Sequence, residues 1–221
     1  GYQHSKSLQS FFSHIPGLKV IMPATPSDAK GLLTAAIRDN NPVICIEHRW
    51  LYWIEDDVRE EPFEFAIGPS TCLRNGSDIT ILATSWMVVE AIRASDILQK
   101  HGVRAEVINA RSIAPFEESL VCASVSHTHH LIIADNDWLN CGFSAEVATR
   151  VMENCFSSLK KPISRIGFAE TPCPTVRCLE DKFYPNAETI IRAVEKQLRL
   201  DPIDLSDEEM FSHESKFRGP F

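Results

Sequence analysis

The stretch Ile79-Thr80-Ile81-Leu82-Ala83, together with the periodic segment 86–100 and Gly102 that follow it, decides the fold class. A short, nearly continuous apolar run is typical of a strand that is buried on both faces of a parallel sheet. The segment after it carries apolar residues at roughly helical spacing, and Gly102 is a natural left-handed end for that helix. With a further strand over 104–109, the stretch predicts a βαβ unit.

The same alternation continues toward the carboxyl end of the chain. We predict helices over 116–125, 144–156 and 187–198, and strands over 131–134 and 163–166. Repeated alternation of this kind predicts an α/β fold with a mostly parallel, Rossmann-like sheet that has helices on both faces. The stretch has no glycine-rich phosphate fingerprint, so we expect no dinucleotide site in it.

Residues 1–65 contain a smaller set of elements. We predict a short helix over 7–14, a strand over 19–22, a helix from the N-cap Thr25 to about residue 38, and a strand over 43–46. Two strands and two helices are too few to close a hydrophobic core. We therefore expect this part of the chain to belong to a larger sheet.

Composition excludes several classes of function. The 221 residues include 22 Lys and Arg against 30 Asp and Glu, a net charge of −8. This balance disfavours a nucleic-acid-binding protein, which usually carries a basic face. No apolar run approaches the roughly 18 residues that a membrane helix needs. The seven cysteines are too few and too scattered for a disulfide scaffold, so we expect a reducing compartment, the cytoplasm or an organelle matrix.

Acidic residues gather in two segments that set the expected domain boundaries. Six of the ten residues in 55–64 are acidic, and we interpret this segment as a solvated inter-domain linker. The tail over 199–221 carries three basic and six acidic residues, 3 − 6 = −3. For the tail we expect either disorder or an extended arm across a partner. The predicted organisation is 1–65, 66–198 and an acidic tail over 199–221.

Two polar groups outside these motifs have an ordinary structural explanation. His127, His129 and His130 suggest a metal-binding tract, but no second cluster completes a tetrahedral site, so a polar turn is favoured. Asp135 and Asp137 could form a pair of carboxylates. Because they follow the end of a predicted strand, we interpret them as loop caps.

Several motifs of the chain, taken together and in order, resemble one family. They are Gly1-Tyr2-Gln3-His4-Ser5, Ile15-Pro16-Gly17-Leu18-Lys19-Val20, Asp28-Ala29-Lys30-Gly31-Leu32-Leu33, Arg111-Ser112-Ile113-Ala114-Pro115 and Gly142-Phe143. The sequence is similar in them to the beta subunit of the thiamine-diphosphate-dependent 2-oxo acid dehydrogenases, which include the pyruvate, branched-chain and acetoin enzymes. The resemblance covers residues 1 to about 198.

This resemblance implies a fold and an activity. Residues 1–65 would be the last part of a thiamine-pyrimidine-binding domain plus a linker, and 66–198 a transketolase-type C-terminal domain. The complete enzyme would decarboxylate a 2-oxo acid on thiamine diphosphate and acylate a lipoyl domain. The implied partners are an alpha subunit, which holds the diphosphate and magnesium, a second beta subunit and a lipoyl acyltransferase.

The family's cofactor-activating glutamate lies upstream of the Gln-His-Ser motif. We therefore expect the chain to be a C-terminal fragment of such a subunit. By itself it would be inert and would retain an assembly surface.

His4 is the candidate catalytic residue that the resemblance implies. In the family, the histidine of this motif faces the cofactor's thiazolium ring and the bound 2-oxo acid. An imidazole that titrates near neutrality can donate to oxygen atoms there or relay a proton. Without the resemblance, a histidine that caps the helix over 7–14 would be the more common interpretation.

A candidate metal site follows the helix that ends near residue 38. A helix C-terminus leaves carbonyl oxygens unpaired, and oxygen ligands suit a hard cation. The family binds a structural potassium ion here, so the resemblance implies Ala36, Ile37, Asp39 and Asn41 as ligands. The alternative is an ordinary helix stop before Pro42.

One departure and two alternative functions remain open. Cys141 stands where the family usually has glycine, so we expect a stiffer loop. Another thiamine enzyme, such as a transketolase or a deoxyxylulose-phosphate synthase, would share the fold of the second domain. A non-enzymatic interaction module would use the α/β domain and the acidic tail.

Overall fold

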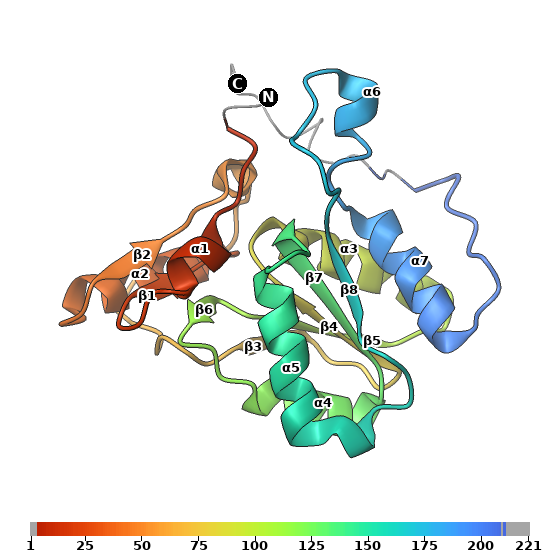
Figure 1. Cartoon of the computed structure of the whole chain (residues 1–221), viewed down its shortest axis with the longest axis horizontal. Helices are drawn as coiled ribbons and strands as arrows, with labels where there is room; N and C mark the ends of the chain where they lie inside the picture. The colour runs from red at the N-terminus through yellow and green to blue at the C-terminus, as the bar shows by residue number, and fades with distance from the viewer. Residues whose placement is uncertain (1–3, 209, 211–221) are drawn as a thin grey trace.

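The computed structural model describes residues 4–208 and 210, and its largest element is a five-stranded sheet (Figure 1). Four strands of this sheet are parallel to one another, and only β3 at the edge is antiparallel. In spatial order the strands are β3 (Thr71–Arg74), β5 (Ala105–Asn109), β4 (Ile79–Ala83), β7 (Leu131–Trp138) and β8 (Ser164–Phe168). The predicted α/β class and mostly parallel sheet are confirmed.

Helices cover both faces of this sheet (Figure 1). They are α3 (Trp86–Lys100) and α7 (Ala187–Leu198) on one face, and α4 (Ser119–Thr128) and α5 (Phe143–Cys155) on the other. The strands supply both cores by alternation: Ile81 packs toward α3 and α7, whereas Leu82 packs toward α4 and α5. None of the helices within the described residues is long and apolar enough to span a membrane.

The amino-terminal part forms a separate three-stranded sheet whose third strand comes from far along the chain. Its order is β2 (Val43–Cys45), β1 (Lys19–Ile21) and β6 (Ser112–Ala114). β1 and β2 are parallel, as in a larger α/β sheet, and β6 runs antiparallel to β1. The sequence predicts β1 and β2 but not β6.

Two helices flank this sheet, α1 (Gln9–Ser13) and α2 (Pro26–Arg38). α2 begins as predicted at Thr25, whose hydroxyl accepts from Asp28 N at 3.0 Å while the Asp28 carboxylate accepts from Thr25 N at 3.2 Å. α1 is shorter than the predicted helix over 7–14. Elements that the sequence did not predict are β3, the 3₁₀ helices η1 (Arg49–Trp53) and η2 (Phe156–Ser158), and α6 (Arg177–Glu180).

The described part of the acidic tail packs onto its own chain. Ile203 and Met210 are buried in the core beneath α3 and α7. Ile203 N donates to Glu195 Oε1 at 2.7 Å, and the Arg93 guanidinium donates to Met210 O at 3.3 Å. The tail is therefore an extended arm over residues 200–208 and at Met210, but it crosses helices of the same chain. Residues 211–221 lie outside the described residues.

Candidate functional site

His4 is exposed and opens the described chain, in the segment that leads into α1. α1 begins after Leu8, and no side chain caps it. The alternative interpretation, in which His4 caps this helix, is therefore wrong. The structure places His4 on a non-helical segment with its ring accessible to solvent.

Polar residues along this segment attach it to the C-terminal part of the chain. The Ser5 hydroxyl hydrogen-bonds with Tyr184, and Ser7 Oγ accepts from Asn136 Nδ2 at 3.0 Å. Gln9 Nε2 donates to Asp135 Oδ1 at 3.1 Å, and Ser10 Oγ donates to Asp137 Oδ2 at 2.7 Å. The described segment is thus fixed by side chains rather than by regular secondary structure.

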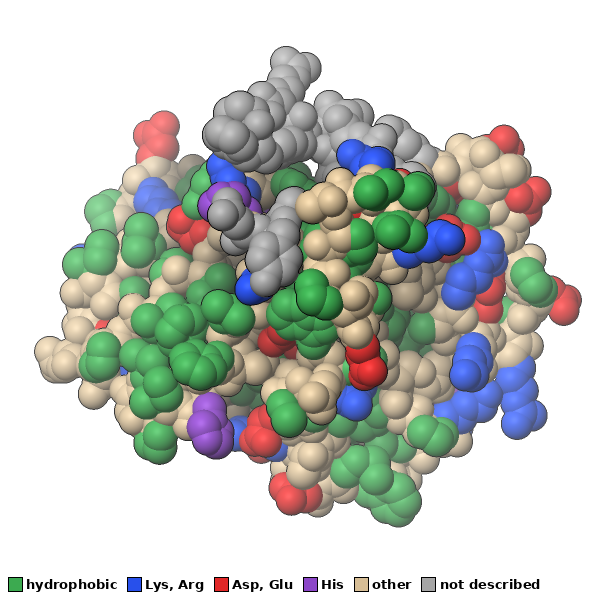
Figure 2. Space-filling model, turned by 45° about the horizontal axis from the view of Figure 1, so that its top comes forward, with side chains coloured by type: hydrophobic (Ala, Val, Ile, Leu, Met, Phe, Trp, Pro, Cys, Tyr) green, Lys and Arg blue, Asp and Glu red, His purple; other side chains and the backbone are tan. Residues whose placement is uncertain are grey.

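Three apolar residues of the same segment are exposed, whereas Phe12 packs against the core beneath α4 and α5. Leu8, Phe11 and Ile15 have exposed fractions of 49%, 71% and 46%. Figure 2 shows hydrophobic side chains gathered on the side of the molecule where α1 lies. The face of α1 that is buried thus combines the polar side chains of Gln9 and Ser10 with the ring of Phe12.

Asp135 is the centre of these contacts. Its side chain is completely buried and also accepts from Thr84 Oγ1 at 2.8 Å and from Ser144 N at 3.2 Å. Burial, together with the nearby charge of Asp137, raises the pKa of the Asp135 carboxyl to about 6. Burial also raises the pKa of Asp137.

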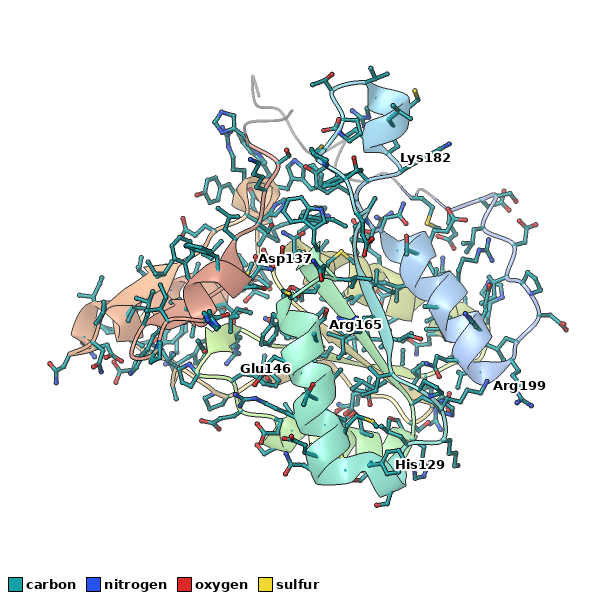
Figure 3. The ribbon with its side chains drawn as sticks, in the orientation of Figure 1. His129, Asp137, Glu146, Arg165, Lys182 and Arg199 are labelled. Atoms are coloured by element: carbon teal, nitrogen blue, oxygen red, sulfur yellow. The ribbon has the colours of Figure 1, made fainter. Side chains whose placement is uncertain are left out.

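The interpretation of Asp135 and Asp137 as loop caps is wrong. β7 continues to Trp138, so both residues lie within the strand and point to the same face. Figure 3 shows Asp137 at the end of β7, near α1 and the start of α5. A charged residue in a buried strand is not signalled by the apolar pattern, because its partners Gln9 and Ser10 lie more than a hundred positions away in the sequence.

A second anchor joins α2 to the end of β5. Asp28 Oδ1 forms an ion pair with Arg111 Nε at 2.7 Å, and Asp28 Oδ2 accepts from Asn109 Nδ2 at 2.7 Å. Arg111 has a positive φ of 52°, and its guanidinium lies 4.3 Å from the centre of the Phe65 ring. Phe65, which directly follows the predicted linker over 55–64, is therefore packed against this anchor.

An aromatic cluster connects η1, the start of α3 and the loop before α7. Trp50 meets the Trp86 ring edge to face at 5.2 Å and the Tyr184 ring at 5.4 Å, and His48 stacks on Trp86 at 5.9 Å. Because Tyr184 also contacts Ser5, the cluster borders the segment that carries His4. Sequence reasoning missed this cluster, since its members come from separate elements.

The predicted potassium ligands lie at the end of α2, but a cationic side chain already engages one of them, Asp39. Asp39 Oδ2 pairs with the Lys19 ammonium, and Asp39 Oδ1 accepts from Asn41 N at 2.8 Å. The hydrogen bond from Lys19 is the main reason why the pKa of Asp39 is lowered to about 2. Ala36 O accepts from Asp39 N at 3.3 Å, and the Ile37 side chain is exposed. These donors do not fit a potassium ion unless Lys19 is displaced.

The three histidines near residue 130 do not gather around a common point. His129 Nδ1 lies 2.9 Å from Ser158 O, and His130 Nδ1 lies 3.4 Å from Gln197 Oε1. Within residues 4–208 and 210, no three His, Cys, Asp or Glu side chains form a group that could hold a metal ion. His127 lies in the last turn of α4, whereas His129 and His130 lie between α4 and β7.

A pocket of about 460 Å³ lies between α1 and α5, and Ser10, His14, Phe143, Glu146 and Arg150 are among its lining residues. Its arginine is already paired, because Arg150 Nε bonds Glu146 at 2.8 Å and Arg150 Nη1 donates to Phe116 O at 3.0 Å. The pocket therefore offers no uncommitted charge at Arg150 for an anionic ligand. His4 and Asp39 lie outside it.

The chain is similar in sequence to proteins that are named as beta subunits of acetoin and pyruvate enzymes. It is 38% identical to the acetoin:2,6-dichlorophenolindophenol oxidoreductase subunit beta of Cupriavidus necator, over 89% of this chain and 58% of that protein. It is 40% identical to the mitochondrial pyruvate dehydrogenase E1 component subunit beta-2 of Oryza sativa, over 89% of this chain and 53% of that protein. It is 37% identical to the human mitochondrial pyruvate dehydrogenase E1 component subunit beta, over 90% of this chain and 56% of that protein. The chain thus spans little more than half the length of these relatives.

Among solved structures, a split-gene transketolase, an inactive beta4 tetramer, superimposes with a TM-score of 0.70. It is 23% identical and covers 88% of this chain and 61% of its own, so the likeness concerns the fold. Two family models match the sequence: the transketolase pyrimidine-binding domain over residues 1–53, and the transketolase C-terminal domain over residues 68–190. Because the second match spans more than half of the 221 residues, the chain belongs to the transketolase C-terminal domain family.

Proposed function

We propose that this chain acts in the beta subunit of a 2-oxo acid dehydrogenase that depends on thiamine diphosphate. The observation that carries the proposal is the identity of 37–40% to beta subunits of pyruvate and acetoin enzymes over about nine tenths of the chain. The family as a whole depends on thiamine diphosphate. The reaction is decarboxylation of a 2-oxo acid followed by acylation of a lipoyl domain.

In this proposal residues 1–65 belong to the pyrimidine-binding domain with its linker, 66–198 form the C-terminal domain and 199–221 the acidic tail. The family matches over 1–53 and 68–190 support the first two. The partners are an alpha subunit, which holds magnesium and the diphosphate, a second beta subunit and a lipoyl acyltransferase. The named relatives are bacterial or mitochondrial, which supports the cytoplasm or the mitochondrial matrix as the location.

His4 is the catalytic residue of the proposal. Thiamine diphosphate, when bound, supplies the electron sink for decarboxylation. His4 donates a hydrogen bond or passes a proton to oxygen atoms of the reacting 2-oxo acid. Its exposed ring and the side-chain anchors of the segment behind it support this role. A potassium ion at Ala36, Ile37, Asp39 and Asn41 belongs to the proposal only with Lys19 displaced.

The test is turnover by the complete beta subunit that contains this chain, assembled with an alpha subunit and thiamine diphosphate. Reduction of dichlorophenolindophenol is followed with pyruvate, branched-chain 2-oxo acids and sugar phosphates, and acylation of a free lipoyl domain is followed by mass spectrometry. We expect turnover with a 2-oxo acid and an acylated lipoyl domain. Turnover with sugar phosphates alone would instead assign a transketolase-type activity.

A further inference from the structure

The segment that carries His4 packs against the carboxyl ends of two neighbouring strands, β4 and β7. β4 and β7 are adjacent parallel strands, and the helices that follow them, α3 and α5, pack on opposite faces. In doubly wound folds, the crevice at the carboxyl ends of two such strands is where ligands bind. Here Thr84 at the end of β4 and Asp135 on β7 both face this crevice, and the Gln9 side chain of α1 reaches them.

Gln9 fills the crevice as a ligand would. Its side chain is fully buried, and Nε2 donates to both Asp135 Oδ1, at 3.1 Å, and Asn136 O, at 3.2 Å. Within the described residues no group donates to Gln9 Oε1, which is buried as well. Burial of an oxygen without a partner opposes docking. Gln9 therefore favours the docked position only through the two contacts of Nε2.

We propose that Asp135 is a positioning residue: through Gln9 Nε2 it holds the segment that carries His4 against the carboxyl end of β7. The contact between this segment and β7 does not depend on the function proposed above, whereas an effect of the contact on catalysis by His4 rests on that function. Beside this contact, Ser7 accepts one hydrogen bond from Asn136, and the Ser10 hydroxyl donates to Asp137 and accepts from Phe143 N at 2.9 Å, which limits rotation of the segment.

Docking through Asp135 is linked to proton uptake. The charged group that acts on this carboxyl is Asp137 on the same strand, whereas β4, α1 and α5 face it with the neutral side chain of Thr84, the amide of Gln9 and the main chain of Ser144. Release of α1 would expose Asp135 to water, which lowers its pKa, and would also remove the Gln9 hydrogen bond, which acts in the opposite direction. Because burial is the larger of these effects, docking weakens as the pH rises through about 6. A full return of the pKa from about 6 to the ordinary 3.8 sets the upper limit, about a tenfold loss of docking between pH 5 and pH 7.

Hydrogen exchange measures the docking of residues 4–14 and requires no catalytic turnover. Protection of the amides in peptides covering residues 4–14 is followed by mass spectrometry at pH 5, 6 and 7, after correction for the intrinsic exchange rate. In the unmodified chain we expect protection to fall by up to about tenfold from pH 5 to pH 7. In Asp135→Asn, which keeps the shape and cannot titrate at this position, we expect a clearly smaller fall, because only Asp137 still titrates beside the segment.

Two further variants keep the test independent of folding. Gln9→Ala removes the Nε2 contacts, and we expect low protection of residues 4–14 at every pH while β4 and β7 keep theirs. Asp96→Asn makes the same change as Asp135→Asn at an exposed position of α3, and it should keep the pH dependence of the unmodified chain. A pH dependence in Asp135→Asn as large as in the unmodified chain would assign the effect to Asp137 and overturn the role of Asp135. Protection of residues 4–14 that is unchanged in Gln9→Ala would overturn the positioning contact as well.

These outcomes are separate from those of the activity assay. An assembled enzyme without turnover on 2-oxo acids, but with the expected exchange, would contradict the proposed function and leave the positioning role in place. Turnover on 2-oxo acids with unchanged exchange in Gln9→Ala would contradict the positioning role alone.

Discussion

Asp28 and Arg111 form a buried ion pair, with 2.7 Å between Asp28 Oδ1 and Arg111 Nε, and side-chain exposures of 1% and 16%. Asp28 also belongs to the capping box of α2, and Arg111 lies between β5 and β6, directly before Ser112. One carboxylate therefore serves both the start of a helix in the amino-terminal part and the contact between this part and the C-terminal domain.

Asp28→Asn should strongly destabilise the chain. Loss of one partner leaves the buried Arg111 guanidinium without its countercharge, which costs about 3–5 kcal/mol in comparable buried pairs. Urea unfolding followed by circular dichroism measures the free energy of unfolding.

The matched control is Asp96→Asn, which breaks the Arg74–Asp96 pair on the surface. Exposed pairs contribute at most about 1 kcal/mol. Equal losses in the two variants would show that the Asp28–Arg111 pair carries no special share of the stability.

His4→Ala should lower turnover of the assembled enzyme without a change in folding. A positioned general acid or base contributes about 10²–10⁴-fold to the rate. The exposed ring of His4 does not cap α1, so its removal should leave the unfolding curve unchanged. The measurement is kcat on the preferred 2-oxo acid. His14→Ala, an exposed histidine after the same helix, is the control and should keep full turnover.

Much of the fold could be predicted from local pattern. The limits of α3 and α7 agree with the predicted 86–100 and 187–198 because apolar periodicity and end signals such as Gly102 coincide there. β6 could not be predicted, since three residues become a strand only by pairing with β1, about ninety positions earlier. The same holds for the site: His4 is found through a motif, but Asp135 is defined by Gln9, a contact that no local pattern contains.

Cys141→Gly should stabilise the chain. Cys141 has a φ of 53°, in the left-handed region where a side chain costs energy and glycine does not. We expect a gain of up to about 1 kcal/mol in the free energy of unfolding. Cys178→Gly is the control: Cys178 lies in α6 outside that region, so the same substitution should cost roughly 0.5–1 kcal/mol. A loss in both variants would contradict strain at Cys141.

Lys19→Met should convert the end of α2 into a site that responds to potassium. The Lys19 ammonium engages the Asp39 carboxylate, which also accepts from Asn41. Removal of that cation leaves one carboxylate beside the carbonyl oxygens of a helix C-terminus, which favours a hard cation. Thermal unfolding is compared in potassium and sodium chloride at equal ionic strength. For Lys19→Met we expect a higher Tm in potassium chloride than in sodium chloride. For the double variant Lys19→Met/Asp39→Asn we expect the same Tm in both salts. A Tm that does not depend on the cation in Lys19→Met would leave Asp39 with the ordinary role of ending α2.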